Sequence, residues 1–130
     1  MRRVSVVTVC LNARDCIRLT LDSVARQTFP GMEHVVIDGG STDGTCDIVK
    51  EYRPVHFVSE KDNGVYDAMD KGAKAATGDI VIFLNAGDTF YDARCCDDVA
   101  AFFEETGADI VFGNLMPVYL DAAGTHDHGA

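Results

Sequence analysis

The stretch IVIFLNAGDTFYD, residues 80–92, decides how the rest of the chain is interpreted. It begins with an unbroken apolar run at 80–84, which predicts a strand buried on both faces. Asn85 and Asp88 follow this run directly. Strands buried on both faces belong to parallel sheets, and ligands of such sheets bind just outside the carboxyl ends of the strands. The stretch therefore predicts an α/β fold with a polar site where this strand ends.

Strand and helix patterns alternate along the whole chain. Further strands are predicted at 4–10, 34–37, 55–58 and 110–112, with 117–120 as a candidate sixth. Helices are predicted at 14–27, 45–52, 65–76 and 93–106, the last with Asp92 as N-cap and Gly107 as C-cap. The buried face of the third helix is predicted to consist of Val65, Met69, Gly72, Ala73 and Ala76. This alternation predicts a mostly parallel, doubly wound sheet with helices on both faces.

The composition limits the class of protein. The 130 residues, 47% hydrophobic and 25% charged, fit one globular domain. No apolar run reaches the roughly 20 residues of a membrane-spanning helix. We interpret MRRVSVVTVC at the start as a first strand rather than a signal peptide, which predicts a cytoplasmic protein with five reduced cysteines. The net charge of −10 argues against a nucleic-acid partner, and a phosphate ligand would need a bridging cation.

Polar side chains follow each of the first four predicted strands. They are Asn12, Asp38, Glu60 with Asp62, and Asn85 with Asp88. At any one strand end, a turn or a helix cap is the better explanation of such residues. In a parallel sheet, however, these four ends lie at one edge and form an acidic crevice. Oxygen ligands of this kind suit Mg²⁺ or Mn²⁺.

Several familiar motifs are not met. The segment GGSTDGT, residues 39–45, has a threonine where a P-loop requires lysine, and it lacks the dinucleotide pattern G-x-G-x-x-G. Its Ser41, Thr42 or Asp43 is instead predicted to cap the following helix. His34 and His56 fall in strands and are predicted to be packed rather than catalytic. No Ser-His-Asp or Cys-His arrangement is apparent.

Two long stretches carry a family resemblance. SVVTVCLNARDCIRLTLDSVARQTFPGMEHVVIDGGSTDGT resembles the opening of family-2 glycosyltransferases of the GT-A fold. SEKDNGVYDAMDKGAKAATGDIVIFLNAGDTF looks like its continuation in bacterial members that build surface polysaccharides. The resemblance implies an inverting glycosyltransferase that moves a sugar from a nucleotide-diphosphate sugar, with UDP-sugars favoured, to a saccharide or lipid-linked acceptor. It also implies a cytoplasmic domain at the inner face of the membrane, with any peripheral association arising from other parts or partners.

The resemblance assigns roles to individual residues. In the family's D-D-G-S-T-D-G-T loop the acidic residues hold the base; Asp38 fills the first position here, but Gly39 replaces the second. Asp88 fills the last place of the D-x-D-type motif and is the implied metal ligand, while Asn85 stands at its first place. The remaining residues implied to contact the donor are Asn12, Asp62, Tyr66 and Asp67. For Asp67, a favourable charge at a helix N-terminus is the alternative, and for Tyr66, simple packing.

The resemblance covers residues 4–113, whereas family members are longer. Their second half supplies the acceptor pocket and the general base that an inverting transfer needs. We find no candidate for that base, so we interpret residues 1–130 as a donor-binding domain that lacks the acceptor half and is inactive alone. Two alternatives remain open at this point. The first is a receiver-like signalling domain, although such a domain should have paired carboxylates where this chain has CLN after its first strand. The second is a non-catalytic module that binds metal or nucleotide.

Overall fold

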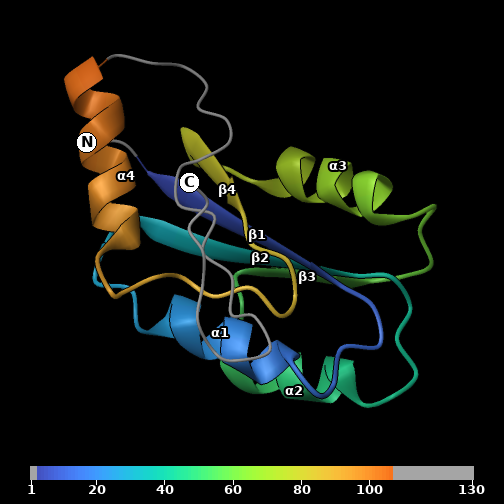
Figure 1. The fold of residues 1–130 in the computed structure, drawn as a ribbon. Coiled ribbons are helices and arrows are strands. Elements are labelled where there is room, and N and C mark those ends of the chain that lie inside the picture. The colour runs from blue at the N-terminus through green and yellow to red at the C-terminus, as the bar shows by residue number, and fades with distance from the viewer. Residues whose placement is uncertain (1–2, 107–130) are drawn as a thin grey trace.

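The computed structural model describes residues 3–106, in which strands and helices alternate. The strands are β1 (Val4–Cys10), β2 (Met32–Asp38), β3 (His56–Ser59) and β4 (Ile80–Phe83). The helices are α1 (Ile17–Ala25), α2 (Thr45–Tyr52), α3 (Val65–Ala75) and α4 (Cys95–Thr106). The sheet order is β3-β2-β1-β4, and every neighbouring pair is parallel (Figure 1). The predicted α/β fold is confirmed, and the carboxyl ends of the four strands share one edge.

Strand β1 lies inside the sheet, and all seven of its residues are buried. Its side chains alternate between the two faces of the sheet, as the pleat of a strand requires. Val4 and Val6 pack with residues of α1 and α4, whereas Val7 and Val9 pack with Ala68 of α3. Figure 1 shows α1 and α2 on one side of the sheet and α3 on the other. Helices therefore cover both faces, as predicted.

Helix α3 packs closely on the sheet because Gly72 has no side chain. A Cβ atom at Gly72 would lie only 2.2 Å from Cγ1 of Val7. The line of contact runs along Ala68 and Gly72, which are both buried. The predicted buried face is wrong at Ala73, which lies one position round the helix from Gly72 and is exposed. It is also wrong at Val65, which starts the helix at the carboxyl edge of the sheet and is 46% exposed.

Strand β4 is buried on one face only, so that part of the first prediction is wrong. Ile80 and Ile82 belong to the cluster beneath α4. Val81 and Phe83 point to the other face and are 38% and 40% exposed. The reason is the position of α3, which packs on β1 and β2, so that the described residues cover this face of β4 only in part. The strands predicted at 110–112 and 117–120, and the C-cap at Gly107, lie outside the described residues.

Most element boundaries agree with the predictions within a few residues. Helix α1 begins later than predicted, at Ile17, and α4 begins at Cys95. Asp92 does not cap α4 directly; its Oδ1 atom accepts a hydrogen bond of 2.9 Å from the backbone N–H of Arg94, before the helix starts. Within residues 3–106 no helix is long and apolar enough to cross a membrane.

Three of the five cysteines are buried, as predicted for core residues, whereas Cys16 and Cys46 are only half-buried. The histidine of β2 is packed, as predicted. All five cysteines are free thiols. His34 packs against β1, where its Nε2 atom lies 2.8 Å from Oγ1 of Thr8. Burial lowers the pKa of His34 to about 4, so the ring is neutral at pH 7. A neutral imidazole that is already hydrogen-bonded has a structural role here.

Candidate functional site

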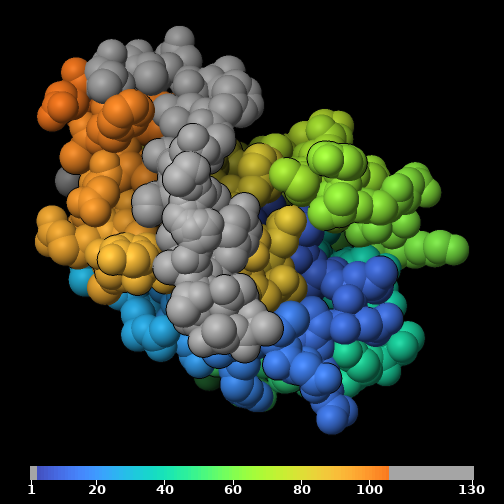
Figure 2. Space-filling view, in the orientation of Figure 1, coloured from blue at the N-terminus to red at the C-terminus, as the bar shows by residue number. Residues whose placement is uncertain are grey.

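A cavity opens where the strands end. It has a volume of about 390 Å³ and is walled by the segments that follow β1, β3 and β4. Figure 2 shows the surface hollowed between the yellow-green atoms of α3 and the blue atoms near the end of β1. The polar side chains in its lining include Asn12, Asp62 and Asn85. The apolar part of the lining includes Val9, Ala13, Val65, Ala68 and Ala86.

The turn after β4, residues 85–88, forms one wall of this cavity. Backbone pairing with β1 continues past the strand, because the N–H of Ala86 donates to the carbonyl oxygen of Val9 over 3.1 Å. The N–H of Asp88 then donates to the carbonyl oxygen of Asn85 over 2.9 Å and closes a β-turn. Gly87, the third residue of that turn, has φ 99°, a conformation that favours glycine. The turn is thus anchored to the central strand.

Side chains of helix α1 form hydrogen bonds with the backbone of the same turn. The hydroxyl of Thr20, which is fully buried, accepts from the N–H of Gly87 over 2.8 Å and donates to the carbonyl oxygen of Asp88 over 2.7 Å. One turn further along α1, Ser23 accepts from the N–H of Phe90 over 3.2 Å. Beyond the helix, Gln27 donates to the carbonyl of Asp92 and accepts from the N–H of Cys96. These three residues bind the backbone of the segment that links β4 to α4 and of the first turn of α4.

Asp88 and Asn85 have the character expected of cation ligands. Burial raises the pKa of the Asp88 carboxyl above its usual value, and no cationic side chain among residues 3–106 forms a salt bridge with it. The Oδ1 atom of Asn85 is buried and has no hydrogen-bond partner within the described chain. A buried acceptor without a donor costs free energy unless a ligand or a metal satisfies it. The turn therefore presents the Asn85 amide oxygen and the Asp88 carboxylate, and neither is paired with a cationic side chain of the described residues.

The described residues contain no complete metal cage. No group of three His, Cys, Asp or Glu side chains within 3–106 is arranged to hold an ion. This does not disqualify Mg²⁺ or Mn²⁺, because Mg²⁺ commonly uses one or two carboxylates together with waters and substrate phosphates. Asp88 and Asn85 fit that pattern, in which the phosphates of a ligand complete the coordination.

Asp38 ends β2, and its carboxylate is fully buried and occupied. Its Oδ2 atom accepts from the backbone N–H groups of Gly40 and Ser41, over 3.0 and 2.7 Å, and from the hydroxyl of Ser59 over 2.8 Å. The Ser41 hydroxyl and the thiols of Cys10 and Cys46 donate as well. Burial alone would raise the pKa of Asp38, but the hydrogen bonds from Ser41 and Ser59 outweigh it and lower the pKa to about 2. Asp38 therefore organises the loop after β2.

The loops after β1 and β2 are joined by reciprocal hydrogen bonds. Asn12, which has φ 47°, donates its N–H to the hydroxyl of Ser41 over 2.7 Å and accepts from the N–H of Thr42 over 2.9 Å through Oδ1. Asp43 accepts from the N–H groups of Arg14 and Thr45. Of the three predicted caps of α2, Asp43 is thus the one that bonds the start of the helix. Asn12 thus joins the two loops and also lines the cavity.

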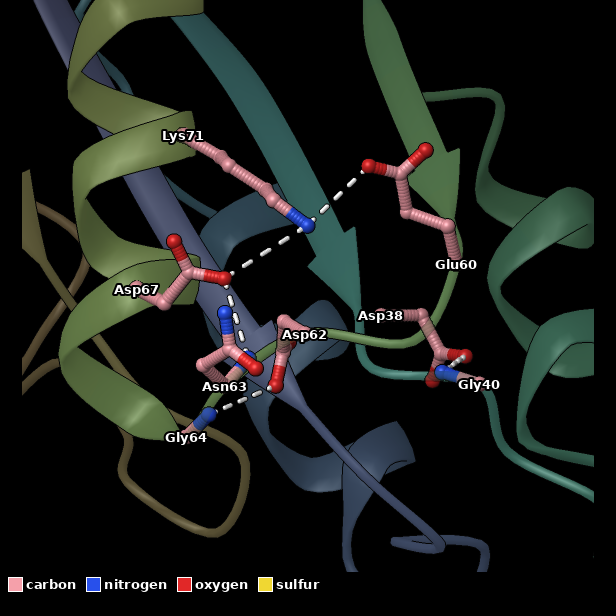
Figure 3. A network of polar contacts seen from close by, with 8 residues as sticks. All are labelled: Asp38, Gly40, Glu60, Asp62, Asn63, Gly64, Asp67 and Lys71. Atoms are coloured by element: carbon pink, nitrogen blue, oxygen red, sulfur yellow. Dashed lines mark hydrogen bonds and ion pairs between the residues drawn. The ribbon is translucent and has the colours of Figure 1, made fainter.

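A third network orders the loop between β3 and α3 (Figure 3). Lys71 lies between Glu60 and Asp67, with its Nζ atom 3.0 Å from Oε2 of Glu60 and 3.7 Å from Oδ2 of Asp67. Asp67 also accepts from the N–H of Asn63 over 3.0 Å. Asp62 accepts from the N–H of Gly64 over 3.1 Å through Oδ1. Asp67 thus stabilises the start of α3, the alternative role considered above, and Asp62 is the carboxylate of this loop that lines the cavity.

Comparison with known proteins now identifies the class. The model of the family described as "Glycosyl transferase family 2" matches residues 5–129. The chain belongs to glycosyl transferase family 2. This family-2 domain is 40% identical over 118 residues to a PGL/p-HBAD biosynthesis glycosyltransferase of Mycobacterium bovis, covering 86% of this chain and 46% of the relative. It is also 40% identical over 90 residues to the putative teichuronic acid biosynthesis glycosyltransferase TuaG of Bacillus subtilis, covering 65% and 36%.

Solved structures share the fold of this family-2 domain. Residues 1–349 of S. aureus TarS in complex with UDP-GlcNAc align with a TM-score of 0.74 and 32% identity, over 81% of this chain and 32% of that one. The mannosyltransferase PcManGT of Pyrobaculum calidifontis, in complex with GDP-Man and Mn²⁺, has a TM-score of 0.71 at 24% identity, over 78% and 32%, and shows the fold alone. The chain spans about half the length, or less, of the relatives it matches. Family membership decides against the receiver-like alternative.

The predicted donor residues of the family-2 domain occupy different positions around the site. Asn12, Asp62 and Asn85 line the cavity. Asp88 belongs to the turn whose first two residues line it, and Asp38 lies buried under the adjoining loop. Tyr66 is 82% exposed, and Asp67 is engaged by Lys71 and Asn63. Contact of these residues with a donor stays a prediction.

Sequence reasoning missed the residues that hold the site in place. These are Thr20, Ser23 and Gln27. Thr20 and Ser23 place polar groups on the side of α1 that its apolar stripe also uses, and Gln27 follows the helix. The sequence predicts Cys16 as a core thiol, but it lines the cavity, and its sulfur lies 3.6 Å from the position a Cβ of Gly87 would take. The signal that could have found Thr20 and Ser23 is that these polar residues interrupt the apolar, buried face of α1.

Proposed function

We propose that this family-2 domain binds a nucleotide-diphosphate sugar together with Mg²⁺ or Mn²⁺ and presents the sugar for transfer to a saccharide or lipid-linked acceptor. UDP-sugars are the favoured donors, because TarS residues 1–349, at 32% identity, are described in complex with UDP-GlcNAc. The process we assign is synthesis of bacterial cell-surface polysaccharide, in keeping with a relative from B. subtilis that is named for teichuronic acid biosynthesis. Transfer with inversion and a cytoplasmic location at the inner face of the membrane remain part of this proposal.

The turn after β4 is the observation that carries the proposal. A buried, unpaired amide oxygen at Asn85 and a desolvated carboxylate at Asp88 lie together on a turn beside a cavity. A divalent cation held there would neutralise charge that develops on a diphosphate leaving group. The chain itself supplies a rigid position for these oxygens, through β1 and Thr20. The net charge of −10 is compatible with an anionic ligand only when such a cation lies between them.

Titration of the 130-residue chain with UDP, with and without Mn²⁺, tests the proposal. Asp88→Asn keeps the size of the side chain and removes its charge, so it should abolish the Mn²⁺-dependent part of UDP affinity and leave the melting temperature nearly unchanged. Asp92→Asn is a suitable control, since Asp92 is exposed and its carboxylate lies in the same acidic segment. Calorimetry that finds the same Mn²⁺-dependent affinity in Asp88→Asn would refute the metal assignment. We expect donor binding without multiple turnover from this chain alone.

A further inference from the structure

The linker between β4 and α4, residues 84–94, is bonded to side chains of the α1 region at every second residue from 88 to 92. Thr20 and Ser23 bond the backbone at residues 88 and 90. Gln27, just past the end of α1, donates through Nε2 to the carbonyl oxygen of Asp92 over 2.6 Å. Figure 1 shows this linker, in yellow to orange, passing α1 on its way to α4.

The side-chain amide of Gln27 also bonds the start of α4. Its Oε1 atom accepts from the backbone N–H of Cys96, the second residue of that helix, over 2.9 Å. The first N–H groups of a helix have no partner inside the helix, so they need an acceptor from elsewhere. Here the acceptor comes from a residue 69 positions earlier in the chain. One amide thus joins the end of the linker to the first turn of α4.

Thr28 strengthens the same attachment. Its backbone N–H and its hydroxyl both donate to the carbonyl oxygen of Ala93, over 2.9 and 3.1 Å. The bend at residues 92–96 is therefore attached to residues 27–28. Gln27 makes its bonds to this bend through its side chain alone, so a substitution at position 27 removes them without changing the backbone.

This attachment bears on the proposed cation site because the linker begins with the turn that carries Asp88. Three residues separate Asp88 from Asp92. On its amino side the turn is held by β1, through the N–H of Ala86. On its carboxyl side it is held by the bonds to Thr20, Ser23 and Gln27. A ligand of a metal has to be held within about 0.5 Å of its working position, so slack on either side matters.

We propose that Gln27 is a positioning residue for the cation site, because its amide fixes the far end of the linker whose first residues include Asp88. This inference rests on the proposed function. If Gln27 serves only as a cap of α4, its loss lowers stability and leaves the cation site intact. If it positions Asp88, its loss weakens the effect of the cation on donor binding.

Two substitutions of Gln27 separate these roles. Gln27→Met keeps the unbranched shape and removes both bonds. Gln27→Glu keeps an acceptor for the N–H of Cys96, where a negative charge at a helix N-terminus is favourable, but a carboxylate cannot donate to the carbonyl of Asp92. Thr77→Val is the control, since it removes a hydroxyl bond of 2.9 Å to Glu33 before the amino end of β4, away from the cavity.

Calorimetric titration of the 130-residue chain with UDP, with and without Mn²⁺, measures the Mn²⁺-dependent gain in affinity for each variant. This gain should fall by about tenfold or more in both Gln27 variants, the range for groups that orient a metal ligand. The affinity for UDP without Mn²⁺ should not change. Gln27→Glu should melt at a higher temperature than Gln27→Met, because it keeps the cap. Thr77→Val should melt at a lower temperature than the unchanged chain and keep the whole gain.

A Gln27→Glu variant that keeps the full Mn²⁺-dependent gain would limit Gln27 to capping α4 and overturn the proposal, even where Gln27→Met does not fold. An equal loss of the gain in Thr77→Val would also overturn it, because the loss would then follow stability alone. In both cases the unchanged chain still binds UDP more tightly with Mn²⁺, and the proposed function stands. An unchanged chain that gains no affinity from Mn²⁺ would overturn the proposed function, and this inference with it.

Discussion

Replacing Thr20 with valine should loosen the turn that carries Asp88. Valine has nearly the shape of threonine, so the packing of α1 is kept while the hydroxyl is lost. The N–H of Gly87 and the carbonyl oxygen of Asp88 then lose the partner that lies 2.8 and 2.7 Å away in the structure. An unsatisfied buried backbone group costs about 1–3 kcal/mol, and two such groups give a loss in unfolding free energy of about 2–6 kcal/mol. Water reaching the half-buried turn brings the expected value to the lower part of that range.

The effect of Thr20→Val on binding follows from the same geometry. Groups that orient a metal ligand typically contribute tenfold to a hundredfold to metal affinity. We therefore expect the Mn²⁺-dependent affinity for UDP to fall by at least about tenfold in Thr20→Val. Thr20→Ser keeps the hydroxyl and removes one methyl group, so it should lose only about 1 kcal/mol of stability and retain Mn²⁺-dependent binding.

Denaturant unfolding and calorimetric titration of the same protein samples measure both effects. Thr8→Val is the matched control, since Thr8 is also fully buried but its hydroxyl contacts the ring of His34 rather than the turn. It should lower stability and leave the Mn²⁺-dependent affinity intact. If Thr20→Val unfolds like Thr20→Ser, the two hydrogen bonds do not stabilise the turn. If it is destabilised but binds with unchanged Mn²⁺ dependence, Thr20 has no positioning role.

Two further predictions concern charge. Asp38→Ala removes the acceptor of the N–H groups of Gly40 and Ser41, so it should lower the unfolding free energy by on the order of 3 kcal/mol. It should also weaken the binding of every nucleotide ligand alike. A loss of nucleoside affinity with an unchanged melting temperature would instead indicate that Asp38 contacts the base directly. His34 has a pKa of about 4 in the folded state, against an ordinary value of 6.5. Below pH 6.5 the unfolded chain therefore binds a proton at this residue before the folded chain does. The free energy of unfolding should fall as the pH drops from about 6.5 to 4. In urea titrations across this range His34→Gln should flatten that slope, and an unaltered slope would show that His34 is not its source.

The sequence by itself determined the order of elements and the edge at which chemistry occurs. The apolar run before Asn85, the β-branched run 4–10 and the helical spacing of Ile17, Leu21 and Val24 are local patterns. Alternating strands and helices have essentially one handedness of connection, so a parallel sheet follows from their order. A parallel sheet gathers its carboxyl ends, and the cavity between Asn12, Asp62 and Asn85 lies there.

Only the tertiary structure decided what each polar residue does at that edge. Asp38 and Asp62 look alike in sequence, yet one is enclosed by donors from Ser41 and Ser59 while the other lines the cavity. Thr20 looks like an ordinary helix residue until the turn some 68 positions later lies against it. The exposed face of β4 likewise depends on where α3 comes to rest. Hydrogen bonds and exposure depend on distances between segments far apart in the chain, and a local pattern does not contain those distances.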